Sequence, residues 1–130
     1  MARKENTQET EEKVFPTRSE AIAVASPIGV TPRKCRLVVD LVRGKPLASA
    51  YDILNHTNKA AAKPVYKVIR SAEANAVNNF HMDASLLYVH SIQVNDSFRL
   101  KRYMPRAKGS SSSIVKRWSS IRVVLREKGA

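Results

Sequence analysis

The chain has 130 residues, of which 43% are hydrophobic, and its 23 Lys and Arg against 11 Asp and Glu give a formal net charge of +12. This length predicts one domain with extensions, and the hydrophobic content excludes a wholly disordered chain. No apolar run approaches the roughly 18 residues that span a bilayer, which excludes integral membrane insertion. The excess of positive charge predicts a polyanionic partner, either nucleic acid or an anionic membrane surface.

The charge is distributed unevenly along the chain. Residues 1–20 carry 4 basic and 5 acidic side chains, residues 21–95 carry 9 and 4, and residues 96–130 carry 10 and 2. This asymmetry predicts a localised anion-binding element in the last third. We interpret residues 1–20 as a disordered charged tail with no feature of a secretion signal or transit peptide, and residues 21–128 as a single domain. Cys35 is the only cysteine, which excludes an internal disulfide and is compatible with a reducing compartment.

The sequence of the first part of the domain predicts a short strand followed by two helices. Residues 21–25 alternate isoleucine or valine with alanine, a pattern typical of a strand. Thr31 and Pro32 form an N-cap with proline at the first helical position, and Gly44 ends that helix. Its predicted apolar face is Leu37, Val38, Leu41 and Val42. Pro46 can open a second, short helix with Leu47, Ala50, Ile53 and Leu54 on one side.

A third helix is predicted to be the longest. Asn58 can cap it, and its apolar face follows the helical period at Val65, Val68, Ile69, Ala72 and Ala76. Pro64 either begins the helix proper or kinks the turn before it, because proline lacks the N–H and clashes with the preceding turn.

Two β-rich segments, 86–94 and 113–126, flank a turn-rich stretch and predict an antiparallel hairpin. Arms of about 15 residues extend roughly 50 Å, which is longer than a body of this size, so the hairpin must project from it. In the projecting part, at about 94–118, cations stand on both faces among apolar and aromatic side chains. Such a ribbon is marginally stable alone, whereas RNA would neutralise its charge and accept stacking by its aromatic side chains. An ordinary solvated hairpin is the alternative.

Three motifs in order resemble a known family: TPRKCRLVVDLVRGK at 31–45, SAEANA at 71–76 and KRYMPRAKG at 101–109. They are similar to the bacterial-type universal large-subunit ribosomal protein family numbered twenty-two, and the likeness covers about 21–126. The resemblance implies an α+β fold, with three helices packed on a three-stranded antiparallel sheet and a long projecting β-hairpin. It also implies a structural constituent of the cytoplasmic large ribosomal subunit that binds rRNA, aids its assembly and lines the nascent-peptide exit tunnel with the hairpin tip. The implied partners are large-subunit rRNA, neighbouring large-subunit proteins and the passing nascent peptide, with the chain a monomer in the ribosome.

The candidate site residues include those carried over from the family at the first helix, the hairpin stem and the hairpin tip. The expected RNA-binding residues are Arg33, Lys34, Arg36, Arg43, Lys45, Lys59, Lys63, Arg99, Lys101, Arg102, Arg106, Lys108, Lys116 and Arg117. The expected tunnel-lining tip is Met104, Pro105, Arg106, Ala107, Lys108, Gly109 and Ser110. The chain departs from the family at the serine run 110–113, where relatives often carry an arginine, and at 26–29, where relatives often carry basic residues.

Enzymatic and other binding functions remain as alternatives. His56, His81 and His90 lack metal-ligand spacing, and Cys35 beside the Leu37 stripe is expected to be a buried or half-buried inert thiol. We therefore expect no catalytic residue, metal or cofactor. The main alternative is an architectural DNA-binding protein with β-arms, since Pro105 resembles the wedges that such proteins insert between base steps. A membrane-surface module would need a basic amphipathic helix, whereas the charge here lies in strands.

Overall fold

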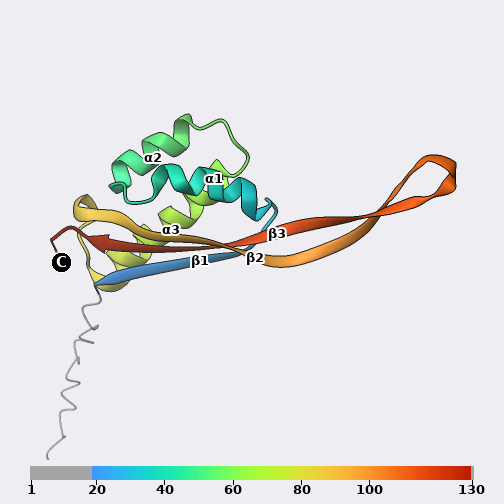
Figure 1. Cartoon of the computed structure of the whole chain (residues 1–130). Helices are drawn as coiled ribbons and strands as arrows, with labels where there is room; N and C mark the ends of the chain where they lie inside the picture. Colours follow the sequence, from blue (N-terminus) through green and yellow to red (C-terminus); the bar gives the residue numbers. More distant parts are fainter. Residues whose placement is uncertain (1–18, 130) are drawn as a thin grey trace, which may run out of the picture.

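The computed structural model describes residues 19–129 and confirms the predicted order of strands and helices (Figure 1). The elements are β1 (Glu20–Ile28), α1 (Pro32–Val42), α2 (Leu47–His56), α3 (Ala62–Phe80), β2 (Leu87–Pro105) and β3 (Ser111–Glu127), with short 3-10 turns at Ala84–Leu86 and Ala107–Gly109. The predicted disordered tail lies outside the described residues up to residue 18. Glu20, assigned to that tail from sequence, begins β1 instead, where it lies opposite Arg126 of β3 in the ladder and forms an ion pair with it.

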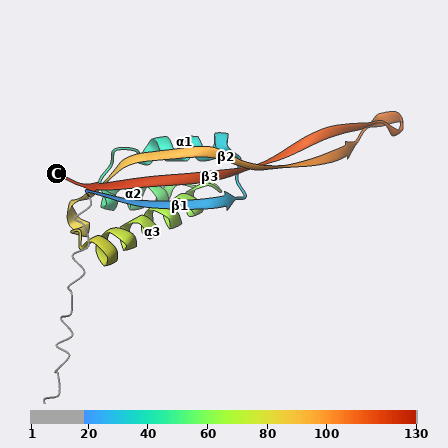
Figure 2. The same ribbon diagram turned by 90° about the horizontal axis from the view of Figure 1, so that it is seen from below.

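The three strands form one antiparallel sheet in the order β1-β3-β2, which makes β3 the central strand. The helices cover one face of this sheet (Figure 2). The fold is therefore α+β, with three helices on a three-stranded antiparallel sheet, as predicted. The segment after α1 adds to the outer edge of β2, where Val89 donates to the Lys45 carbonyl and accepts from Gly44, both at 3.0 Å.

β1 packs closely against α3 because the residues it turns inward are small. Ala21 and Ala23 are buried, whereas Ile22 and Val24 are 37% and 60% exposed on the uncovered face of the sheet. On α3, Ala72 and Ala76 are fully buried. Alanine on these facing surfaces lets the helix and the strand approach closely.

The apolar face of α1 is rotated from the predicted one. Val38 and Val42 are buried, but Leu37 and Leu41 are 67% and 48% exposed. The buried stripe is Cys35, Val38, Val39 and Val42. Both sets of residues follow the helical period, and the packing of α1 on the sheet decides which of them is buried. Gly44 ends the helix as predicted, with a φ of +77° that favours glycine.

α3 begins later than predicted, with Ala61 rather than Asn58 at the N-cap position. Pro64 falls in the first turn of the helix, where backbone N–H groups have no intrahelical partner to lose. The helix proper therefore starts close to the proline and continues to Phe80. Its predicted apolar face, from Val65 to Ala76, is buried.

β2 and β3 continue beyond the body as a long hairpin (Figure 1). β2 has 19 residues, which at a rise of about 3.3 Å per residue gives roughly 60 Å. The buried core ends at Val94 on β2 and Ser119 on β3, and residues 101–111 are all exposed. The hairpin therefore projects as predicted. Among residues 19–129, no helix is both long and apolar enough to cross a membrane.

Candidate nucleic-acid interface

The projecting hairpin concentrates positive charge more than any other stretch of the chain. Residues 97–118 contain seven Lys and Arg and no Asp or Glu. We call residues 99–103 and 113–117 the stem and residues 104–110 the tip. The five cations of the stem are all exposed: Arg99, Lys101, Arg102, Lys116 and Arg117.

The register of the stem places cations on both faces of the ribbon. Arg99 lies opposite Arg117, and Lys101 lies opposite Val115 on the same face. On the other face, Lys116 lies opposite Leu100, and Arg102 lies opposite Ile114. A ligand covering only one face would leave part of this charge unneutralised. The distribution suits a partner that surrounds the ribbon.

The opposed pair Arg99 and Arg117 is unfavourable within the protein alone. Like charges directly across an antiparallel pair repel and destabilise it. Within residues 19–129, Arg99 is the only stem cation in an ion pair, with 3.6 Å between its Nη2 and Oδ2 of Asp96, and both side chains are about half exposed. A single exposed ion pair of this kind contributes little to the stability of the folded hairpin. The stem therefore gains most from counter-charge supplied by a partner.

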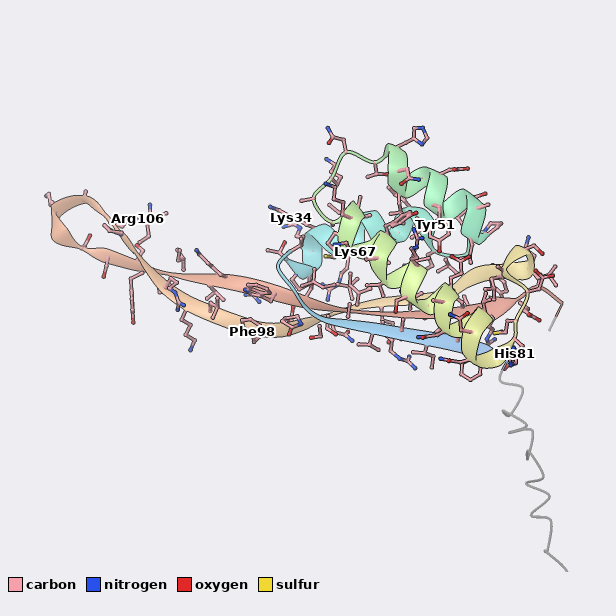
Figure 3. The ribbon with its side chains drawn as sticks, turned by 180° about the vertical axis from the view of Figure 1, so that it is seen from behind. Lys34, Tyr51, Lys67, His81, Phe98 and Arg106 are labelled. Carbon is pink, nitrogen blue, oxygen red and sulfur yellow. The ribbon has the colours of Figure 1, made fainter. Side chains whose placement is uncertain are left out.

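The tip is a tight turn held by its own hydrogen bonds. The Arg106 N–H donates to the Ser110 carbonyl at 2.7 Å, and the Ser110 hydroxyl donates to the Ala107 carbonyl at 2.8 Å. Lys108 and Gly109 both adopt positive φ, at 58° and 72°. The serine run contributes as well, since Arg106 Nε donates to the Ser112 hydroxyl at 3.2 Å. The turn presents Arg106 and Lys108, both exposed, at the far end of the arm (Figure 3).

Two predicted RNA-binding arginines, Arg36 in α1 and Arg43 directly after it, also bind within the protein. One Nη of Arg36 donates to the Val94 carbonyl at 3.1 Å, and one Nη of Arg43 donates to the Ile92 carbonyl at 3.0 Å. Both carbonyls belong to β2, which is an edge strand. The arginines therefore cap the exposed edge of the sheet while keeping further N–H donors at the surface.

The remaining predicted cations lie on the body in two groups. Arg33 and Lys34 begin α1, at the end of the body from which the hairpin emerges, and Lys45 follows α1 (Figures 1 and 3). Lys59 lies in the α2–α3 connection and Lys63 in the first turn of α3. All five are exposed. The structure thus brings the stem and tip cations together along the arm and leaves the α1 and α3 groups on the body.

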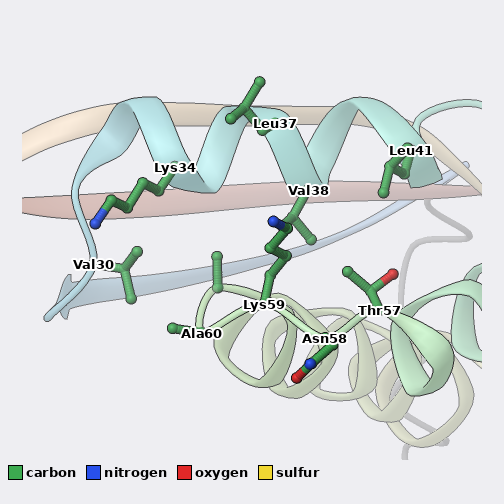
Figure 4. Close-up of a pocket in the computed structure, with 10 residues that line it drawn as sticks. Val30, Lys34, Leu37, Val38, Leu41, Thr57, Asn58, Lys59 and Ala60 are labelled. Atoms are coloured by element: carbon green, nitrogen blue, oxygen red, sulfur yellow. The ribbon is translucent and has the colours of Figure 1, made fainter.

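α1 and the α2–α3 connection enclose an open groove of about 500 Å³ (Figure 4). Its lining is mostly apolar, with Val30, Leu37, Val38 and Leu41 on one side. Lys34 and Lys59 are the cations among its lining residues. The groove does not gather the acidic or nucleophilic groups that hydrolytic chemistry needs.

Polar groups elsewhere in the body have structural partners. Cys35 is buried, as predicted, with its Sγ 3.5 Å from the Ser119 hydroxyl. Tyr51 donates to the Glu73 carboxylate, and burial together with this bond raises the pKa of the Tyr51 phenol. That bond ties α2 to α3. Within residues 19–129, no three His, Cys, Asp or Glu side chains gather as metal ligands.

Sequence reasoning missed several surface groups. Arg122 is exposed on the uncovered face of the sheet, between Val24 of β1 and Gln93 of β2. Ile121 and Val123 on either side of it are buried. Because side chains alternate between the two faces of a strand, the sequence could have predicted that Arg122 lies on the uncovered face. Phe98 and Trp118 lie twenty positions apart, and nothing in the sequence indicated that their rings stack.

The fold and charge define a small α+β protein with a long basic β-arm. A family model described as ribosomal protein L22p/L17e matches residues 23–126. Similar proteins named large ribosomal subunit protein uL22 occur in Oceanobacillus iheyensis, 50% identical over 84% of this chain and 96% of its own, and in Lactobacillus delbrueckii subsp. bulgaricus, 51% identical over 84% and 93%. Another with the same name, in Aster yellows witches'-broom phytoplasma, is 50% identical over 81% of each chain.

The chain therefore belongs to the ribosomal protein L22p/L17e family. Its place is in the large ribosomal subunit, which in bacteria is cytoplasmic.

Proposed function

We propose that this chain binds large-subunit rRNA, with its body on the RNA surface and its hairpin inserted between RNA segments. The observation that carries the proposal is the stem, where five exposed cations face both ways and the one ion pair is a weak one with Asp96. Folded RNA presents phosphates on several sides of a narrow channel, and neutralising the stem would supply much of the binding free energy. The exposed donors of Arg36 and Arg43, with Arg33, Lys34 and Lys45, extend this surface onto the body. Lys59 and Lys63 form a smaller contact.

The same contacts give the protein a role in assembly of the subunit. An arm of about 60 Å reaches RNA segments that the body does not touch. Binding both sets at once holds them together without any chemical step, so the protein acts as a structural component and not as an enzyme. In the ribosome it is a monomer, and neighbouring large-subunit proteins are its further partners.

The tip is proposed to line the nascent-peptide exit tunnel. Residues 104–110 are exposed, and the closed turn at Arg106–Ser110 makes the end of the arm compact. The serine run leaves two cations at the tip, Arg106 and Lys108, with Arg106 bonded to Ser112. A photoreactive amino acid at position 108 tests this assignment in ribosomes carrying an arrested nascent chain. Cross-links to the peptide are expected, and cross-links to rRNA alone would remove the tunnel-lining role.

Competition binding tests the main proposal. The purified protein is titrated with labelled large-subunit rRNA fragments in a series of salt concentrations, with duplex DNA and anionic vesicles as competitors. We expect a preference for particular rRNA fragments that persists near physiological salt. Equal or better binding to bent duplex DNA would favour an architectural DNA-binding protein with β-arms, and displacement by vesicles would favour a membrane-surface module.

A further inference from the structure

The hairpin leaves the body at an irregularity in the strand ladder. Asp96 pairs with Ser119 and Arg99 pairs with Arg117, so Ser97 and Phe98 together oppose Trp118. This is the arrangement of a β-bulge, which bends the strand and redirects side chains. We call Ser97, Phe98 and Trp118 the root of the hairpin.

The bulge brings two aromatic rings into a stack. The ring centroids of Phe98 and Trp118 are 5.0 Å apart, and the ring planes are inclined by 21°. Gly29 lies against the six-membered ring of Trp118. A Cβ atom added to Gly29 would be 3.6 Å from Cζ3 of that ring. Trp118 is half-buried, whereas Phe98 is 41% exposed. Figure 3 shows Phe98 on the hairpin where it leaves the body. The open aromatic surface of the pair is therefore on Phe98.

A cation occupies the next ladder position on the face of this ring. Leu100 and Lys116 pair with each other on the same face as the two aromatic side chains, whereas Arg99 and Arg117 lie on the opposite face. Neither Phe98 nor Trp118 belongs to the buried core of the body. An exposed aromatic ring on a ribbon with cations on both faces is a combination that binds single-stranded nucleic acid, since the ring stacks on a base while the cations bind phosphates.

We propose that Phe98, supported by Trp118, is a stacking platform for an unpaired nucleobase of the RNA at the root of the hairpin. This inference rests on the proposed function and adds a specific element to it. Phosphate contacts along the stem can form with the backbone of any RNA segment. The platform, in contrast, requires a nucleobase that is not paired within an RNA helix. It therefore favours a single-stranded segment or bulged nucleotide at the place where the arm enters the RNA.

The test uses the full chain and a single-stranded oligoadenylate that carries one 2-aminopurine, whose emission falls when the base stacks. A duplex RNA of the same length is the second probe. Phe98→Leu removes the aromatic face but keeps an apolar side chain, and Phe98→Tyr restores the face. Tyr88→Leu is the matched control, because Tyr88 is a half-buried aromatic residue of β2 in the body, where its ring contacts that of His90. Trp118, the only tryptophan in the chain, reports by its emission whether each variant keeps the root folded.

The wild-type protein and Phe98→Tyr should quench 2-aminopurine emission. Phe98→Leu should lose the quenching and bind the single strand about tenfold more weakly, as expected for one lost stacking contact, with duplex binding nearly unchanged. Tyr88→Leu should behave as the wild type. Unchanged single-strand affinity in Phe98→Leu would overturn the platform, and so would an equal loss for both probes, which indicates a structural role. If the wild-type protein bound neither probe, the proposed function itself would fail.

Discussion

Replacing Lys101, Arg102, Lys116 and Arg117 with alanine removes four of the five stem cations. None of the four is in an ion pair within the described residues, so their removal breaks no salt bridge. Each phosphate contact contributes about 0.7 to 0.9 to the slope of log affinity against log salt, so the slope should fall by about 3. Between 50 and 200 mM salt, the wild-type protein should then lose about 50- to 150-fold more affinity than the variant.

The assay is fluorescence anisotropy with a labelled rRNA fragment in a series of KCl concentrations. The matched control removes four exposed cations from outside the predicted interface: Lys67, Arg70, Arg122 and Lys128. Both variants have the same net charge, so a general charge effect would change both slopes equally. A specific stem effect changes mainly the first. Equal slopes for the two variants would refute the reasoning, provided that urea unfolding shows both bodies folded.

Three further predictions concern folding and the tip. Ile69→Ala, at a fully buried position of α3, should lower the free energy of unfolding by about 3 to 4 kcal/mol in urea titrations, and a loss below about 1 kcal/mol would contradict the assigned core. The Arg126 guanidinium lowers the pKa of Glu20, so this pair stabilises the fold above the usual Glu pKa and the contribution is lost as pH falls through the lowered value. Glu20→Gln should therefore lower the urea midpoint at pH 7 and match the wild type at strongly acidic pH; a constant difference would argue against the pair. Gly109→Ala meets no atom within 4 Å but strains a φ of +72°, so the Arg106 amide should exchange faster by hydrogen-exchange NMR while core amides stay unchanged.

Periodic patterns allowed the sequence to predict most elements, but not their contacts. The face of α3 was predicted correctly because its apolar residues recur every three or four positions with no competing stripe. On α1, Leu37 and Leu41 competed with Cys35 and Val39 for the same role, and side-chain size favoured the wrong set. Which stripe is buried depends on how the helix packs on β2, and that is tertiary information.

The sequence predicted where the positive charge of the candidate site lies, but not the contacts that its residues make. The excess of basic over acidic side chains in residues 96–130 predicted an anion-binding element in this part of the chain, and seven of these cations lie on the hairpin. The bulge at the root could not be predicted, because strand register depends on pairing with a distant segment. Without the bulge, the stacking of Phe98 on Trp118 cannot be foreseen. The bonds from Arg36 and Arg43 to β2 carbonyls likewise require the docked position of α1.

The central position of β3 has a consequence for the timing of folding during synthesis. β1 and β2 both pair with β3 and lie on opposite sides of it, and β3 follows both in the chain. The ion pair between Glu20 and Arg126 closes a separation of 106 residues. Long-range pairing of this kind is slow, because the chain loses the conformational entropy of loop closure before the stabilising contacts form. During synthesis, β1 and the helices therefore cannot complete the sheet and bury their apolar faces against it until β3 has emerged from the translating ribosome.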